Sequence, residues 1–210
     1  MTKRFFIAGT DTGVGKTYIA CKLLESFNQQ GLSTVACKPV ASGCETTKQG
    51  LKNEDALHLM QTASIKLPYH EVNPIALQPP IAPHIAAEQI NEEITVEKLI
   101  NMCQPVLNCK ADVLVIEGIG GWYVPLNDNE TMADFVKALD LSVILVVAIR
   151  LGCLNHALLT YHAIRACDVE FHGWVANRID SDMLAAEENV KTLSNWLGRN
   201  KLVSDFSNDL

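Results

Sequence analysis

The 210-residue sequence has no apolar run that approaches the roughly 20 residues needed to span a membrane. Its longest apolar stretch, residues 141–149, has the length of a buried strand. The first residues lead straight into a strand-like segment, without the apolar region and small-residue cleavage site of a secretory signal. We therefore expect a cytoplasmic protein that has no membrane partner.

Positive charge is also in short supply. The chain has 17 lysines and arginines against 24 aspartates and glutamates, which gives a formal net charge of −7. A nucleic-acid-binding domain needs a basic face to neutralise phosphates, so no nucleic-acid partner is expected. Only local positive sites remain, and the individual lysines become the residues to follow.

The seven cysteines include no Cys-x-x-Cys pair, and their number is odd. Cys21, Cys103 and Cys167 stand in helical patterns among apolar neighbours, where a free thiol behaves as a small hydrophobe. The histidines do not cluster either, because His156 and His162 fall off a common helical face. We therefore expect reduced, structural cysteines and no transition-metal site.

What the sequence does contain is an alternation of strand and helix patterns. Apolar strands are expected at residues 4–8, 33–37, 112–116, 143–149 and 171–176. Helices are expected at residues 18–24, continuing toward Gly31, near Ala86, and at residues 54–63, 96–107, 132–139, 154–166 and 183–197. Residues 67–83 carry five prolines and predict an irregular excursion, and residues 118–128 predict a loop.

Strands that are apolar throughout and alternate with helices indicate an α/β fold, with a mostly parallel sheet covered by helices on both faces. No repeat or long linker interrupts the pattern, so we expect a single domain over residues 1–210. Ligands of such sheets bind beyond the carboxyl ends of the strands. Residues 9–17, Lys38, Glu117 and Asn177 all follow or end strands, and we expect them to converge on one edge.

Residues 9–17, GTDTGVGKT, resemble a phosphate-binding loop whose first glycine stands one position too early. The usual pattern is a glycine, four other residues and Gly-Lys-Ser/Thr, which would put a glycine at Thr10. Gly9 is able to take the turn one residue sooner, so the irregularity concerns only the entry to the loop.

The other end of the loop meets the physical needs of a phosphate site. Gly13 and Gly15 let backbone N–H groups approach an anion at a helix N-terminus. Lys16 supplies a positive charge, and the Thr17 hydroxyl is suited to Mg²⁺. A strand-to-helix turn without a ligand is the alternative, which the neighbouring strand, helix and downstream acid disfavour.

Three charged residues are candidates to complete such a site. Glu117 ends a strand and opens EGIGG, whose glycines indicate close approach to a phosphate, so it is a candidate Mg²⁺ ligand rather than a surface acid. Asp55 lies in the first turn of a helix, where an acid usually serves the helix dipole. Lys38 follows a strand and is either solvated or neutralises charge on a transferred phosphoryl group; the residues alone leave both readings open.

The motifs GTDTGVGKT, CKPVASG, EDALHL, EGIGGWYVPL, LGCLNHALLT and GWVANR occur in the order and spacing of the dethiobiotin synthetases. The sequence resembles that family from residue 3 to about residue 197. The resemblance implies a P-loop NTPase-like fold and a ligase of biotin biosynthesis that uses ATP and Mg²⁺. Such an enzyme closes 7,8-diaminopelargonic acid and CO₂ into dethiobiotin through a carbamate and a carbamic-phosphoric anhydride.

The resemblance also implies roles for particular residues. The catalytic residues would be Lys38, Lys16 and Thr12, and the first and last of these would contact the substrate together with Ser42. ATP would be bound by Gly13, Val14, Gly15, Lys16, Thr17, Asp55, Glu117, Gly118, Ile119, Gly120, Asn177 and Arg178. Mg²⁺ would be held by Thr17, Asp55 and Glu117.

The family is homodimeric, with active sites at the subunit interface. The substrate carboxylate would therefore meet Gly152, Cys153 and Asn155 of the partner subunit, where the helix at residues 154–166 begins. A helix N-terminus is a suitable anion site, and this helix is apolar enough for an interface. An ordinary core helix is the alternative.

Two features depart from the family. Many members have Asn-Asp where this chain has Asn177-Arg178, and many end in a strand and a Gly-x-Pro segment around the adenine and ribose, which residues 202–207 lack. ATP is the expected nucleotide, with CTP or GTP substituting measurably. We also expect a Lys38→Ala variant to fold, because a strand-end lysine contributes little to a core.

Two other functions share part of this pattern. Another ATP-dependent synthetase that activates a carboxylate or an amine would have the loop and Glu117, but not KPVASG beside GGW. A switch ATPase that partitions DNA or places division septa carries a second lysine five residues before Lys16, where this chain has Asp11. Such proteins often add a membrane helix or a basic face, and neither is evident here.

Overall fold

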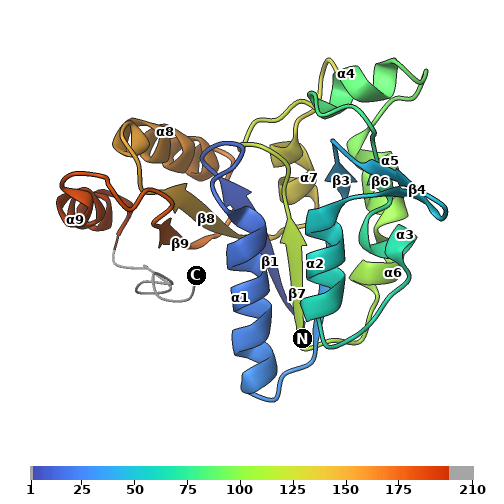
Figure 1. Ribbon diagram of the computed structural model, residues 1–210, viewed down its shortest axis with the longest axis horizontal. Helices are drawn as coiled ribbons and strands as arrows, with labels where there is room; N and C mark the ends of the chain where they lie inside the picture. Colours follow the sequence, from blue (N-terminus) through green and yellow to red (C-terminus); the bar gives the residue numbers. More distant parts are fainter. Residues whose placement is uncertain (1, 199–210) are drawn as a thin grey trace.

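A five-stranded, wholly parallel sheet forms the centre of the computed structural model, which describes residues 2–198 (Figure 1). Its strand order is β2-β7-β1-β8-β9. The strands are β1 (Lys3–Gly9), β2 (Thr34–Cys37), β7 (Val113–Glu117), β8 (Ser142–Ala148) and β9 (Phe171–Asn177). The predicted fold class is confirmed, and all five predicted strands are present within a few residues of the expected bounds.

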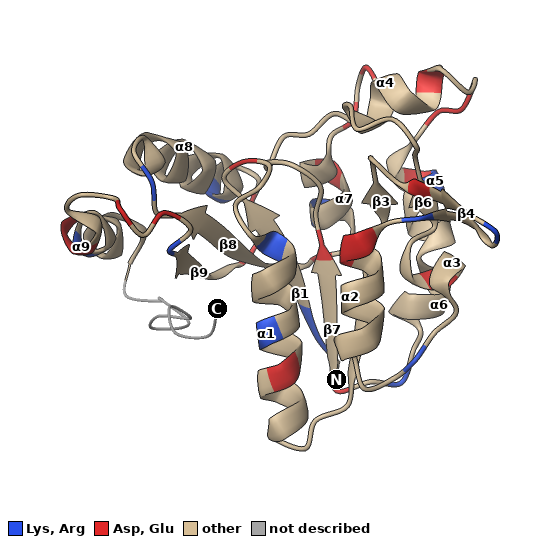
Figure 2. Ribbon diagram, in the orientation of Figure 1, with Lys and Arg blue, Asp and Glu red and all other residues tan. Residues whose placement is uncertain are grey.

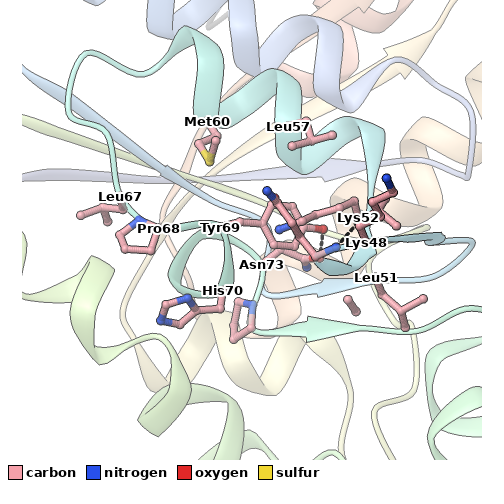
Figure 3. A pocket seen from close by; sticks show the side chains of 14 residues that line it. Lys48, Leu51, Lys52, Leu57, Met60, Leu67, Pro68, Tyr69, His70 and Asn73 are labelled. Atoms are coloured by element: carbon pink, nitrogen blue, oxygen red, sulfur yellow. Dashed lines mark hydrogen bonds between the residues drawn. The ribbon is translucent and has the colours of Figure 1, made fainter.

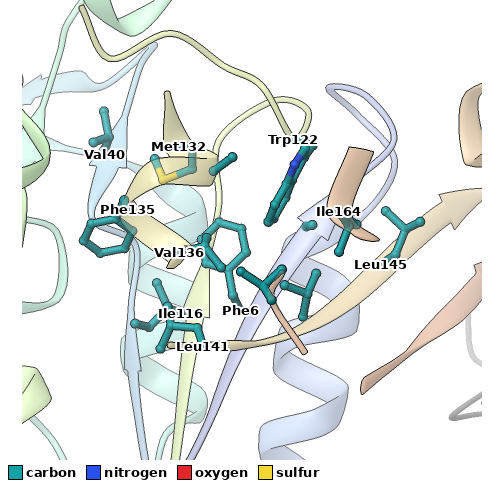
Figure 4. Close-up of a cluster of buried hydrophobic side chains, with 14 of the residues drawn as sticks. Phe6, Val40, Ile116, Trp122, Met132, Phe135, Val136, Leu141, Leu145 and Ile164 are labelled. Atoms are coloured by element: carbon teal, nitrogen blue, oxygen red, sulfur yellow. The ribbon is translucent and has the colours of Figure 1, made fainter. Parts of the chain in front are cut away.

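Alternate residues of β1 enter two separate hydrophobic cores. Phe5 and Ile7 face α1 (Lys16–Gln29) and α2 (Glu54–Thr62). Phe6 and Ala8 enter the other core, drawn in part in Figure 4. That core is covered by α5 (Val96–Met102), α6 (Gln104–Leu107), α7 (Met132–Ala138), α8 (Cys153–Ala166) and α9 (Ala186–Leu197). Burial on both faces explains why the strands are apolar throughout.

Small elements lie between β2 and α5. The two-residue strands β3 (Val40–Ala41) and β6 (Ile75–Ala76) pair in parallel, and β4 (Glu45–Thr47) and β5 (Gly50–Lys52) form a hairpin. Two short helices, α3 (Tyr69–Val72) and α4 (Pro83–Glu88), complete this region.

The expectation of an irregular excursion at residues 67–83 is therefore wrong for α3 and β6. Long-range backbone hydrogen bonds hold this segment: the N–H of Ile75 donates to Pro39 O at 3.1 Å, and that of Leu77 donates to Ala41 O at 2.8 Å. Partners so distant in the sequence leave no local periodicity to read.

Two helix boundaries also differ from the prediction. The helix expected at residues 96–107 is divided into α5 and α6, because Pro105 lacks a backbone N–H and suits only a first helical turn. The last helix starts at Ala186, after Ala185 in a left-handed conformation, and not at Met183. The segment at residues 202–207 lies outside the described residues. Between residues 2 and 198, the structure has no helix long and apolar enough for a membrane span.

Candidate active site

The carboxyl ends of β1, β2 and β7 border a cavity of about 800 Å³. Figure 2 shows charges of both signs at this edge, where α1 and α2 begin and β7 ends. The predicted site residues that line the cavity are Thr12, Gly13, Gly15, Lys16, Thr17, Lys38, Ser42, Asp55, Glu117, Ile119 and Gly120. The strand-end residues of β1, β2 and β7 thus lie together, as the rule for parallel sheets predicts.

The front of the glycine loop shows why its first glycine stands early. A Cβ at Gly9 would lie 2.7 Å from Cγ2 of Val14, so the chain tolerates no side chain there. The next residue, Thr10, still continues the sheet, because its N–H donates to Val146 O at 3.1 Å. The close packing falls on the last residue of β1, which moves the glycine one position back.

The rear of the loop is built for close approach of backbone N–H groups. Gly13 and Gly15 have φ angles of 70° and 87°, in the left-handed region that favours glycine, and Gly15 is the N-cap of α1. A Cβ at Gly15 would lie 2.1 Å from Nδ2 of Asn177, which donates a hydrogen bond to Val14 O at 2.8 Å. The end of β9 therefore braces the loop where α1 begins.

Lys16 connects the two glycine segments of the site. Its Nζ donates hydrogen bonds to Asp11 O at 3.0 Å and to Gly120 O at 2.7 Å. Burial lowers the pKa of the Lys16 ammonium to about 8, against the opposing effect of the Glu117 carboxylate. The cation is thus held inside the protein at the edge of the cavity.

Lys38 lies between two carboxylates. Its Nζ is 2.7 Å from Oε1 of Glu117 and 2.8 Å from Oδ2 of Asp55, and the Thr17 hydroxyl donates to the same Glu117 oxygen at 2.8 Å. Lys38 is therefore a buried, paired cation and not a solvated one, and Asp55 points into the site as well as lying in the first turn of α2.

The pKa directions of these groups follow from burial and pairing. Burial raises the pKa of Glu117, although Lys38 opposes the shift. Burial alone would lower the pKa of Lys38, but Glu117 and Asp55 outweigh it and raise that pKa. Burial also opposes the charge of Asp55, and the ammonium of Lys38 outweighs it and lowers the pKa of the carboxyl. The cation is therefore fixed in its charged form by the fold itself.

One oxygen of this cluster lacks a partner. Oε2 of Glu117 is buried and has no hydrogen-bond partner among the described residues. Together with the Thr17 hydroxyl and the Asp55 carboxylate it offers hard oxygen ligands, the kind that Mg²⁺ prefers when phosphates supply the others. The structure contains, within residues 2–198, no cluster of three or more His, Cys, Asp or Glu side chains able to hold a metal.

Several predicted site residues lie outside the cavity lining. Val14 is buried in the core beneath the loop. Gly118 packs on Phe6, whose Cζ would be 2.6 Å from a Cβ at that position. Arg178 forms an ion pair with Glu187 on α9. At the start of α8, outside this cavity, lie Gly152, Cys153 and Asn155.

Sequence reasoning missed two parts of the site. Arg150 lies two residues after the end of β8. Its guanidinium donates to Oδ2 of Asp11 at 2.9 Å, while the other Asp11 oxygen accepts the N–H of Thr12 at 2.7 Å. The strand-end rule that identified Lys38 would also have found Arg150. The second part is a wall made by residues 80–83, Val124 and Pro125, which carries no signal beyond its prolines.

The fold and the glycine loop define a protein of the P-loop NTPase class. The septum site-determining protein MinD from Pyrococcus horikoshii, complexed with Mg-ADP, superposes with a TM-score of 0.56 at 14% identity, covering 91% of this chain and 77% of MinD. Cobyrinic acid a,c-diamide synthase from Mycobacterium smegmatis, with bound ADP and magnesium, gives 0.54 at 16% identity, covering 93% and 82%. These likenesses concern the fold alone.

Relatives with higher sequence identity identify the family within this class to which the chain belongs. A family model described as an AAA domain matches residues 3–203. The ATP-dependent dethiobiotin synthetase BioD of Marinobacter nauticus is 48% identical over 195 residues, which cover 92% of this chain and 83% of the relative. That of Cellvibrio japonicus is 50% identical over 192 residues, covering 91% and 84%. The chain belongs to the family of ATP-dependent dethiobiotin synthetases.

Proposed function

We propose that the cavity at β1, β2 and β7 closes 7,8-diaminopelargonic acid and CO₂ into dethiobiotin with ATP, as a cyclo-ligase of biotin biosynthesis. The observation that carries this proposal is the placement of Lys38, a buried cation paired with Glu117 and Asp55 and adjacent to a phosphate loop. Transfer of a phosphoryl group to a carbamate brings two anions together, and that step needs fixed positive charge above all.

The proposed reaction has three steps. One substrate amine adds to CO₂, forms a C–N bond and releases a proton. An oxygen of the resulting carbamate attacks the γ-phosphorus of ATP, and ADP leaves. The second amine then attacks the carbonyl carbon of the carbamic-phosphoric anhydride and forms the second C–N bond of the ureido ring. The bond from this carbon to the phosphate oxygen breaks, and inorganic phosphate and a proton are released.

Lys16 and Lys38 would neutralise the charge that accumulates on the carbamate and the γ-phosphate. The backbone N–H groups of Gly13 and Gly15 would cradle the phosphates, and Thr12 would face the carbamate. Mg²⁺ would be held by Thr17, Asp55 and Glu117, and when bound it supplies further positive charge beside the transferred group. Oε2 of Glu117, which has no hydrogen-bond partner within residues 2–198, fits this assignment.

The substrate end of the cavity has suitable chemistry. The Ser42 hydroxyl oxygen is buried and has no hydrogen-bond partner within residues 2–198, so a polar group of the substrate would satisfy it. Pro80, Ile81 and Val124 give the cavity apolar walls that fit a methylene chain.

For the nucleotide, we propose that Asn177 reads adenine from its place beside Gly15, and that Gly118, Ile119 and Gly120 in the loop after β7 line the nucleotide site. Arg178 is directed to Glu187, so its contribution to base recognition would be small. We therefore expect CTP or GTP to replace ATP to a measurable extent. Equal inactivity of both in a nucleotide panel would contradict this part of the proposal.

We also propose a cytoplasmic homodimer. All seven cysteines are free, as a reducing compartment would keep them. Leu159 of α8 is 64% exposed, and Leu151, just before this helix, is 95% exposed. A second copy that covers this face would bring Gly152, Cys153 and Asn155 of the partner subunit to the substrate carboxylate, at a helix N-terminus suited to an anion.

The test is an assay that follows phosphate and ureido product with ATP, bicarbonate and diaminopelargonate. We expect both products in equal amounts, and neither when any one substrate is omitted. Phosphate release that does not require the diamine would contradict ring closure. Stimulation by DNA or lipid in its place would favour a switch ATPase.

A further inference from the structure

A segment outside the cavity, residues 69–73, makes hydrogen bonds that fix the positions of Lys38 and Asp55. Lys38 stands on the chain after β2, and Asp55 on the first turn of α2. The short helix α3 and the following Asn73 contact both of these places. None of the residues from Tyr69 to Asn73 lines the catalytic cavity.

The backbone of Lys38 is fixed on both sides by this segment. Its N–H donates to Val72 O at 2.8 Å, and its carbonyl accepts from Nδ2 of Asn73 at 2.7 Å. Asn73 is only 2% exposed, so these bonds lie out of water. A buried amide with satisfied partners holds the geometry around it, because leaving either partner unpaired is costly.

The start of α2 is fixed by the same network. The hydroxyl of Tyr69 donates to Oδ1 of Asn73 at 2.9 Å and accepts the backbone N–H of Asn53 at 2.7 Å. Asn53 is the N-cap of α2, and its Oδ1 accepts the N–H of Ala56 at 3.1 Å. Asp55 is thereby carried at a set position on the first turn of the helix.

The ring of Tyr69 is held in place on its outer side. It borders a second cleft of about 980 Å³, drawn in Figure 3, with Tyr69 beside Lys52 and Asn73 below α2. The ammonium of Lys52 lies 3.7 Å from the ring centre, within the range of a cation–π contact. The hydroxyl therefore points inward, to Asn53 and Asn73, while the ring forms the wall of the cleft.

We propose that Tyr69 and Asn73 are positioning residues that set the distance between Lys38 and Asp55 without touching the substrate. This inference rests on the proposed function, because it assigns Lys38 and Asp55 to the reacting groups. A rigid second layer of this kind matters because charged groups contribute to catalysis only when they are already in place.

The direct test is Tyr69→Phe, which removes one hydroxyl and keeps the ring. We expect kcat to fall about tenfold, a change of about 1.4 kcal/mol in the barrier. The KM and the Kd for ATP should change less than about twofold, because the backbone of the glycine loop is untouched. Asn73→Ala, which removes the link to the Lys38 carbonyl, should give the same division between kcat and KM.

The matched control is Thr62→Val at the opposite end of α2. Its hydroxyl donates to His58 O at 2.8 Å, so this variant removes one hydrogen bond from the helix region, where Tyr69→Phe removes two. Both variants should lower Tm, and Tyr69→Phe should lower it more because it leaves the Asn53 N–H and Asn73 Oδ1 without their hydroxyl partner. Only Tyr69→Phe should lower kcat. A lower Tm with unchanged kcat in Tyr69→Phe would reduce the network to a structural role.

A double variant separates positioning from an independent effect. Asp55→Asn combined with Tyr69→Phe should lose less kcat than the product of the two single losses, since the hydroxyl acts through the carboxylate it places. Multiplicative losses would overturn the inference. If the unaltered protein makes no ureido product, the proposed function fails instead, and the two failures are distinguishable.

Discussion

Two regions of this molecule are assigned to one reaction, and they are built in opposite ways. In the pocket at β1, β2 and β7, Glu117 is 1% exposed, and it and Lys38 find their partners within the chain. At the start of α8, Leu151 is 95% exposed and stands next to the exposed Gly152.

This difference in burial and charge pairing follows from the chemical role proposed for each region. Charges that stabilise a phosphoryl transfer act most strongly away from water, and they must be paired and fixed before the reaction begins. A helix N-terminus already presents its N–H groups, so recognition of a carboxylate needs only that the helix be brought near. We infer that the first region is completed by folding and the second by association.

The largest expected effect comes from removing the buried cation. Lys38→Gln keeps hydrogen-bond donors and loses the charge, and we expect kcat to fall by about 100- to 1000-fold. Lys110→Gln, at an exposed lysine, should leave kcat unchanged. Turnover of Lys38→Gln within tenfold of the unaltered enzyme would show that the pocket does not depend on this charge.

The stability of such variants must be followed beside their activity. The expectation that Lys38→Ala folds normally overlooks that Lys38 is buried against Glu117. Removing one partner of a buried ion pair leaves an uncompensated charge, at a cost of about 3–5 kcal/mol. Circular dichroism and Tm of Lys38→Gln and Lys38→Ala therefore accompany the assay, and we expect the alanine variant to have the lower Tm.

Most of the fold could be predicted because its signals are local. The continuous apolar runs of β1, β7 and β8 and the loop glycines each identify an element from neighbouring residues. The pairing of β3 with β6 could not be predicted, since it depends on backbone partners more than thirty positions apart, such as Val40 and Ile75. The break between α5 and α6 was readable from Pro105.

Some features of the site could likewise be predicted from local sequence signals, and others could not. Residues at strand ends, such as Lys38 and Glu117, were readable because topology brings strand ends together. Their pairing, and the burial that shifts the pKa of Lys16 to about 8, depend on distances that only the folded chain sets. Tyr69 and Asn73 carried no signal, because their role is a network of hydrogen bonds between separate segments.

A smaller effect is expected at the start of α8, where we propose that a second copy of the chain binds. Leu159→Glu places a charge in the proposed interface and should weaken dimerisation more than about tenfold, with a parallel loss of ring closure at low protein concentration. ATP binding should persist, since the pocket lies within one chain. Light scattering and nucleotide titration measure the two quantities.

The control for that variant is Leu184→Glu, at a leucine that is 89% exposed and precedes α9. It should leave both the oligomeric state and the activity unchanged. A Leu159→Glu protein that stays dimeric would remove α8 from the interface. A monomer that retains full activity would show that the first region suffices alone.

The smallest effect is expected where the two regions meet. Arg150 stands between β8 and the start of α8, and its ion pair with Asp11 ties that start to the front of the glycine loop. Asp11 in turn accepts the N–H of Thr12, which we assign to the carbamate. Arg150→Ala should therefore lower kcat/KM for the diamine about two- to fivefold, the range of a partly exposed pair.

The KM for ATP should change less than the kcat/KM for the diamine, because the rear of the loop and Lys16 keep their own contacts. Lys22→Ala, which breaks a comparably exposed ion pair with Glu25 on α1, is the matched control and should change neither. Added salt should shrink the difference in kcat/KM between Arg150→Ala and the unaltered enzyme. Salt screens the Arg150–Asp11 ion pair in the unaltered enzyme, and the variant has already lost that pair. A larger change in the KM for ATP than in the kcat/KM for the diamine would mean that Arg150 supports the phosphate loop alone. The side chain of Arg150 would then not connect the two regions, and only the backbone after β8 would join them.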